Sequence, residues 1–174
     1  MNKDFFKGFI DDVRVELMDE FDRNFERKAF FDQPWAPQRH PNRRGSLLMR
    51  SGALRRSLKA SSGTGEVRFS SSLPYASIQN DGGVITVTVA MKKFFWAMYY
   101  KASGASRGTG ARAIRFSIEA DYWKGLALKK VGSKIRIQAR TFIGDHPQVD
   151  QAVERVLGAT MQKVSDELYK TMKP

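Results

Sequence analysis

The chain has 174 residues, of which 41% are apolar, with no cysteine and only two histidines, His40 and His146. This length and composition are typical of a single folded domain with a sizeable core. The absence of cysteine excludes disulfides, thiolate metal sites and cysteine nucleophiles, and two histidines disfavour a histidine-rich metal site. No apolar run approaches the roughly 18 residues of a membrane helix, and charged residues interrupt the N-terminal apolar residues, so we expect no signal peptide and cytoplasmic synthesis.

The net charge of +12 is unevenly distributed along the chain. Residues 33–65 hold seven basic residues and no acidic one, and residues 91–140 hold twelve basic and two acidic residues. The N-terminal residues 1–32 and the C-terminal residues 141–174 are slightly acidic. A basic middle attracts nucleic acid, an acidic protein surface or anionic lipid, and the charge alone does not choose among them.

Two long amphipathic helices are predicted, one at each end of the chain. The first covers about residues 3–28, where apolar residues recur every four positions. Its apolar stripe consists of Phe5, Phe9, Val13, Leu17, Phe21 and Phe25. The second covers about residues 147–172, with Pro147 suited to its first turn. Its stripe consists of Val149, Val153, Val156, Thr160, Val164, Leu168 and Met172.

Between the first helix and the strands, prolines and glycines shape the chain. Residues 32–46 contain Pro34, Pro37 and Pro41, which predicts an extended loop that Trp35 anchors to the body. Residues 47–58 are predicted to form a short helix whose leucines make apolar contacts, although Gly52 weakens that prediction.

Four segments alternate apolar and polar residues and are predicted to be half-buried strands. They are residues 66–70, 85–89, 114–119 and 134–138. Asp81-Gly82-Gly83 marks a turn before the second of them. Residues 91–101 are predicted to form a short helix, and the small residues at 102–111 a flexible surface loop.

We find no catalytic, cofactor-binding or metal-binding motif, and the chain is not predicted to be an enzyme. Gly104, Gly108 and Gly110 do not fit the spacing of a dinucleotide-binding loop, and no phosphate-cradling Gly-Lys-Ser/Thr occurs. His146 is best interpreted as part of a helix cap, beside Asp145.

Two groups of residues carry alternative interpretations. The aromatic residues at 94–100, flanked by lysines, are able to stack on bases, but packing in the core is favoured. The arginines of the 43–56 segment are able to grip phosphates or a protein partner. Alternatively, they form a solvated face or pair with the acidic first helix.

The order of these elements resembles the phage virion morphogenesis family, the tail-completion or head–tail joining proteins of tailed phages and Mu-like prophages. The resemblance covers nearly the whole chain and rests on four short motifs in the family's order. They are Pro34-Trp35-Ala36-Pro37, Leu48-Met49-Arg50-Ser51-Gly52-Ala53-Leu54-Arg55-Arg56-Ser57, Tyr75-Ala76 through Gly82-Gly83, and Ala139-Arg140-Thr141-Phe142-Ile143-Gly144. Residues 92–130 look like an insertion, and Thr141 stands where the family often has proline.

The resemblance and the residue patterns together predict one α+β domain over residues 1–174, with an antiparallel-rich sheet packed by the long terminal helices. The resemblance implies a structural virion protein without cofactor, made in the bacterial cytoplasm and located at the tail or the head–tail interface. Its expected partners are other tail or neck proteins, copies of itself in a ring, and non-specifically the phage DNA; no membrane is expected. The predicted contact residues are Arg43, Arg44, Arg50, Arg55, Arg56 and Arg140. The alternative function is sequence-independent DNA binding through the basic central segments.

Overall fold

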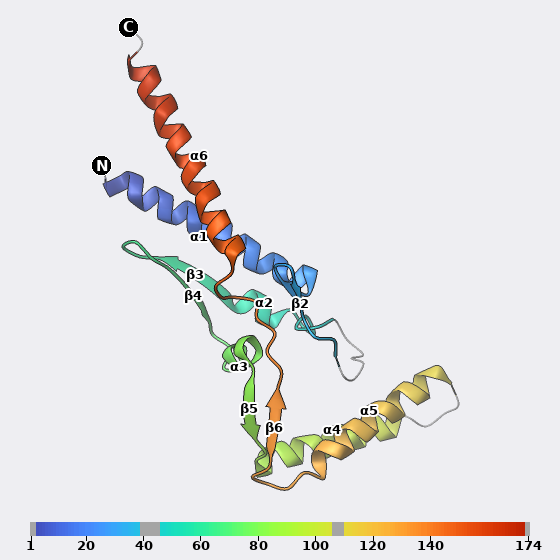
Figure 1. The fold of residues 1–174 in the computed structure, drawn as a ribbon. Helices are drawn as coiled ribbons and strands as arrows, with labels where there is room; N and C mark the ends of the chain where they lie inside the picture. Colours follow the sequence, from blue (N-terminus) through green and yellow to red (C-terminus); the bar gives the residue numbers. More distant parts are fainter. Residues whose placement is uncertain (1–2, 39–45, 106–109, 173–174) are drawn as a thin grey trace. The chain divides into compact units, whose positions relative to one another are not determined.

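A computed structural model describes residues 3–38, 46–105 and 110–172 of the chain (Figure 1). The chain divides into two compact units. The first unit contains the segments up to residue 36, from residue 45 to 81 and from residue 140 onward, and the second consists mainly of residues 82–139. The second unit therefore includes the whole of the predicted insertion, residues 92–130.

The two long helices predicted at the chain ends are both present, in the first unit. Helix α1 spans Lys3–Arg27 and helix α6 spans Pro147–Met172. They lie side by side over part of their length (Figure 1). Their apolar stripes bury a common core together with strand β4 (Val67–Ser71). Its buried members are Val13, Leu17, Phe21, Phe30, Phe31 and Ala152, and the partly buried residues packed against them include Val149, Val153 and Val156 of α6 and Val67 and Phe69 of β4.

Two antiparallel hairpins complete the sheet structure of the first unit. Strands β1 (Ala29–Phe30) and β2 (Gln33–Pro34) form a short hairpin directly after α1, where the sequence predicted an extended loop from residue 32. Phe31 takes a positive φ in its turn. The second hairpin pairs β3 (Leu58–Ser62) with β4, with Ala60 opposite Phe69. The strand predicted at 66–70 is confirmed, whereas β3 was not predicted.

The helix predicted over residues 47–58 is much shorter in the structure. Helix α2 spans only Ala53–Ser57, and Leu58 already begins β3. Leu48 and Gly52 both have positive φ, a left-handed conformation that interrupts a right-handed helix. The leucines of the segment still bury apolar surface as predicted, because a tight turn carries them into the core as a helix would.

A short helix that the sequence analysis missed, α3, spans Ala76–Asp81 and ends at the predicted glycine turn. Gly82 has a φ of 72°, and a Cβ atom there would lie 2.7 Å from the backbone nitrogen of Ala139. Only glycine fits a left-handed position with backbone this close.

The second unit consists of a two-stranded ribbon and a helical hairpin. Strands β5 (Gly83–Thr86) and β6 (Lys134–Ile137) pair antiparallel, so the prediction at 134–138 is confirmed and the one at 85–89 is confirmed only in its first half. Helices α4 (Val89–Ala105) and α5 (Ala111–Ala127) pack against each other. Helix α4 contains the predicted helix 91–101 and begins at Val89, where a strand was predicted.

Two predictions for this unit are wrong. Residues 114–119, predicted as a strand, lie inside α5, where the buried residues Phe116, Ala120 and Ala127 follow helical rather than twofold spacing. An alternation of apolar and polar residues over only six positions does not distinguish a strand from a helix. The predicted flexible loop at 102–111 belongs to α4 up to Ala105 and to α5 from Ala111, since alanine favours helix; residues 106–109 lie outside the described part of the chain.

The α+β class with antiparallel strands and long terminal helices is confirmed. In the part of the chain that the structure describes, the strands form three separate two-stranded sheets.

Candidate interaction surfaces

The four motifs behind the family resemblance converge on one apolar cluster in the first unit. Phe25 of α1 packs there between Trp35 and Phe142, with ring centroids 5.8 and 5.1 Å away. The other buried members are Leu54, Leu58 and Ala76. Each of the four motifs thus places at least one side chain in a single core. The motifs are far apart in the sequence: Trp35 is hydrogen-bonded to Thr141, 106 residues later.

Hydrogen bonds to backbone groups hold the last motif in place. The indole nitrogen of Trp35 donates to the Thr141 carbonyl at 2.6 Å. The Asn80 side-chain oxygen accepts from the backbone nitrogens of Phe142 and Ile143, at 2.9 and 3.1 Å, and its amide nitrogen donates to the Ile143 carbonyl. The fully buried Asn24 donates to the Phe142 carbonyl. These side chains satisfy backbone hydrogen-bonding groups of residues 141–143, which lie outside any helix or strand. The last motif therefore has a structural role.

Arg55, a predicted contact residue, is engaged within its own unit. Its guanidinium forms a bidentate ion pair with the Asp22 carboxylate of α1, and it also donates a hydrogen bond to a Glu26 carboxylate oxygen at 2.7 Å. The hydrogen bond to Asp22, and then that to Glu26, raises the pKa of Arg55. Of the two interpretations of this arginine, pairing with the acidic first helix describes the observed contacts.

The remaining predicted contact residues have different environments. Arg140 is half-buried, donates to the Ala36 carbonyl at 3.3 Å, and burial lowers its pKa. Arg56 is exposed and donates to the Ser51 carbonyl at 2.9 Å, and Arg50 is exposed. Arg43 and Arg44 lie outside the described residues. The four described arginines therefore have different environments, and Arg55 and Arg140 are engaged within the first unit.

His146 takes part in the cap of α6, as the sequence suggested. Its Nδ1 accepts the backbone N–H of Gln148 at 3.2 Å, and its Nε2 lies 3.0 Å from an Asp32 carboxylate oxygen. The ring stacks on Phe31 at 4.7 Å. Among the described residues no group of three or more acidic or histidine side chains is arranged to hold a metal ion. Within the same residues, no helix has both the length and the apolar character needed to cross a membrane.

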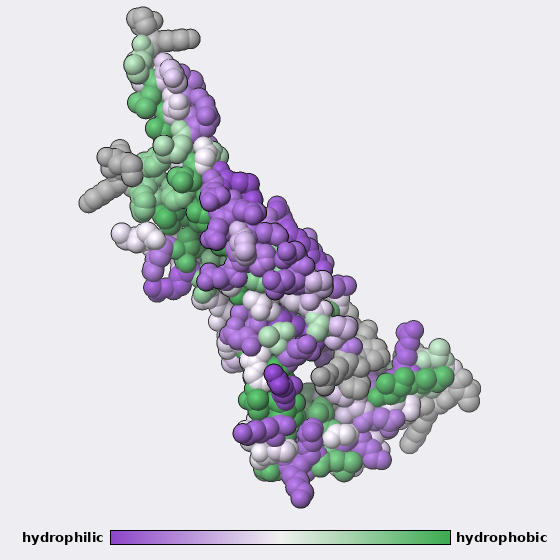
Figure 2. Space-filling model, viewed as in Figure 1, coloured by the Kyte–Doolittle hydropathy of each residue, from purple (hydrophilic) through white to green (hydrophobic). Residues whose placement is uncertain are grey.

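Beyond its contact with α1, helix α6 has a second apolar stripe that faces outward. Leu157, Met161, Leu168 and Met172 follow one another at intervals of four, seven and four residues, which places them on one helix face. All four are exposed, Leu168 by 57% and Met172 by 78%. In Figure 2 the outer half of α6 shows hydrophobic residues along one side and hydrophilic residues along the other. Leu168 and Met172 were predicted on the same stripe as the valines of α6, whereas they lie on this exposed one.

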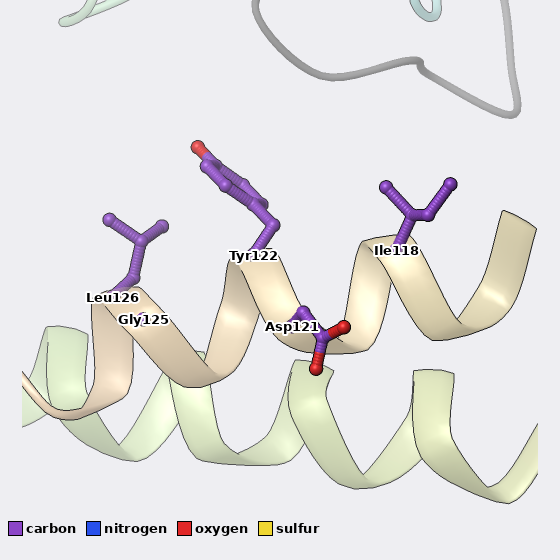
Figure 3. Close-up of a pocket in the computed structure, with 5 residues that line it drawn as sticks. All are labelled: Ile118, Asp121, Tyr122, Gly125 and Leu126. Atoms are coloured by element: carbon purple, nitrogen blue, oxygen red, sulfur yellow. The ribbon is translucent and has the colours of Figure 1, made fainter.

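A shallow pocket of about 460 Å³ lies on the outer face of α5 (Figure 3). Of the described residues, Ile118, Asp121, Tyr122, Gly125 and Leu126 line it. Ile118, Tyr122 and Leu126 project to the same side of the helix, and burial raises the pKa of Tyr122. The pocket is apolar apart from one carboxylate and one phenol, so it offers few polar groups with which to orient a ligand.

The aromatic residues of α4 are divided between core and surface. Phe95 is buried and packs against Trp123 of α5, whereas Phe94 and Tyr100 are largely exposed. Trp96 stacks on Tyr100 with ring centroids 5.9 Å apart. The preferred interpretation, core packing, therefore describes only part of the group.

The ribbon of β5 and β6 has one polar face, which is exposed. Thr86 lies opposite Lys134, and Val84 lies opposite Arg136, so these four side chains share a face and all are exposed. Ile85, Ile135 and Ile137 occupy the other face and are half-buried. Lys129 and Lys130, in the connection from α5 to β6, are exposed as well.

The net charge follows the division into units. The segments 1–36, 45–81 and 140–174 hold sixteen basic and sixteen acidic residues. Residues 82–139 hold eleven basic and two acidic residues, a balance of +9. The remaining three charges come from the arginines between residues 37 and 44. Most of the net charge is thus carried by residues 82–139 of the second unit.

Comparisons of the chain with protein-family models, with curated proteins and with solved structures find no significant match.

Proposed function

We propose that the chain is a structural subunit of a tailed-phage particle that acts in tail completion or head–tail joining. It works through protein–protein contacts and without catalysis. The observation that carries this proposal is the exposed apolar stripe of α6. It extends over residues 157–172, about 24 Å of helix. A contiguous apolar face of this length on one chain is typical of a surface that another protein covers.

The resemblance supports the choice of a phage particle among possible assemblies. The residues that carry it pack together around Phe142, so they describe a scaffold and not a reactive site. In this role the chain is made in the cytoplasm of the bacterial host and is located in the virion. Its partners are neighbouring tail or neck proteins, together with further copies of the chain if head-to-tail contacts close a ring.

The test is complementation of a phage or prophage genome that lacks this gene. The double substitution Met161→Glu with Leu168→Glu places two charges on the stripe without touching the α1 core. We expect a folded protein that leaves heads and tails unjoined in electron micrographs and lowers the titre of infectious particles by orders of magnitude. Wild-type titre from this variant, or from the genome that lacks the gene, contradicts the proposal.

A matched control is available on another face of α6. Gln151→Glu with Ala159→Glu adds the same charge at two exposed positions, and each glutamate precedes a basic residue, Arg155 or Lys163, by four positions. This variant should complement fully. Equal loss in both variants would attribute the effect to charge on the helix and not to the stripe.

The rival function, sequence-independent DNA binding, is favoured by a separate observation, the balance of +9 in residues 82–139. It does not exclude the assembly role, because the two surfaces lie on different elements.

A further inference from the structure

The basic residues of the β5–β6 ribbon have no ion-pair partner among the described residues, unlike several basic residues of the first unit. In the first unit, Arg55 pairs with Asp22, Arg68 with Glu66 and Arg155 with Glu16. Over the described residues, the side chains of Lys129, Lys130, Lys134 and Arg136 form no ion pair or hydrogen bond. These unpaired charges lie in a part of the chain that has an excess of nine, so a polyanionic partner gains favourable electrostatic energy there.

We propose that the exposed face of the β5–β6 ribbon, with Lys129 and Lys130 beside it, is a binding site for the sugar–phosphate backbone of duplex DNA. The inference goes beyond the assembly role and does not depend on it.

The regular charge spacing of duplex DNA favours it among polyanions. A duplex carries one negative charge per about 1.7 Å of helix axis, so several phosphates lie within reach of two strands about 4.8 Å apart. In the described structure the ribbon pairs with no third strand, so its edges are not covered by sheet. Thr86, Lys134 and Arg136 are all residue types that donate to phosphate oxygens.

A lipid surface is the less favoured partner. Leu128 and Val131 are exposed near the two lysines, but the ribbon face itself holds a single apolar residue, Val84, beside three polar donors. Membrane-surface binding depends on a buried apolar face as well as on positive charge. The ribbon offers the charge without that face.

The test is a salt titration of the full chain with a labelled duplex of about 20 base pairs, between about 50 and 200 mM salt. We expect binding without sequence preference that weakens steeply as salt rises. Lys134→Gln with Arg136→Gln removes two phosphate contacts. It should lower the slope of log K against log salt by about 2 and weaken binding about 10- to 100-fold near 0.1 M salt.

The β3–β4 hairpin of the first unit supplies the matched control. Lys59 and Arg68 are exposed on one face of a two-stranded ribbon, as Lys134 and Arg136 are. Lys59→Gln with Arg68→Gln therefore removes the same charge from the same kind of element, and should leave the affinity within about twofold and the slope unchanged.

Three outcomes overturn the inference. They are no duplex binding by the wild-type chain at low salt, equal losses in the two double variants, and binding to phosphatidylserine vesicles but not to duplex. None of these outcomes affects the α6 stripe, and complementation failure of the α6 variant does not affect duplex binding. The two proposals therefore fail separately.

Discussion

Two ribbons of nearly the same construction differ in their packing, in their ion pairs and in the net charge of the unit around them. The β3–β4 hairpin turns its apolar face, with Phe69, toward α1 and α6, and its exposed Arg68 is paired with Glu66. The β5–β6 ribbon exposes Lys134 and Arg136 without partners in the described structure. The first ribbon belongs to a unit whose charges balance, and the second to residues 82–139 with their excess of nine. The contrast teaches that two ribbons of the same local structure present different surfaces when the packing and charge of the units around them differ.

The largest expected effect concerns the core of the balanced unit. Phe142 is 2% exposed and touches Phe25, so Phe142→Ala should destabilise the protein by about 3–5 kcal/mol through lost burial and the cavity that remains. The same substitution at Phe94 of α4, which is 54% exposed, should cost less than about 1 kcal/mol. Urea unfolding followed by circular dichroism measures both. Similar losses at the two positions would contradict the assignment of Phe142 to a core shared by the four motifs.

A smaller effect is expected when an arginine paired within the first unit is compared with an arginine of the β5–β6 ribbon that is unpaired among the described residues. Arg55→Ala removes the pair with Asp22 and Glu26 and should cost about 1 kcal/mol in the free energy of unfolding, with duplex binding unchanged. Arg136→Ala should do the reverse, with stability unchanged within about 0.5 kcal/mol and weaker binding at low salt. Thermal unfolding and the salt titration, run on both variants, give the comparison. If Arg55→Ala weakens duplex binding as much as Arg136→Ala does, the division of roles between the units is wrong.

Parts of the fold were predictable because their signals are long and local. Helix α1 repeats an apolar residue every four positions over six turns, and α6 carries a similar stripe after Pro147, so both were predicted to within a residue or two. The glycine turn was predictable because Gly82 needs a positive φ that other residues rarely adopt.

Other parts depend on tertiary contacts that no local pattern records. Ile114, Phe116 and Ile118 alternate like a strand, yet they lie in α5, where Phe116 is buried at helical spacing from Ala120 and Ala127. The left-handed turn at Leu48 shortens α2, and β3 forms only because β4 lies beside it.

The candidate interaction surfaces were also only partly predictable from the sequence. Arg55 was predicted to meet a partner, but its carboxylate partners lie 29 and 33 residues earlier on α1. The exposed stripe of α6 was missed because Leu168 and Met172 were assigned to the same apolar stripe as the valines of the helix, and the sequence does not say where α1 ceases to cover it. Lys134 and Arg136 were part of a predicted strand, and only the pairing of β5 with β6 shows that they share an exposed face with Thr86.

The most direct test of the contrast between the two units is hydrogen–deuterium exchange of the full chain with and without the duplex, at low salt. The account predicts slower exchange on DNA addition in β5, in β6 and in the connection at residues 128–133, and no change in β3–β4. Slower exchange in β3–β4, or none in β5 and β6 under conditions in which the duplex is bound, would contradict it.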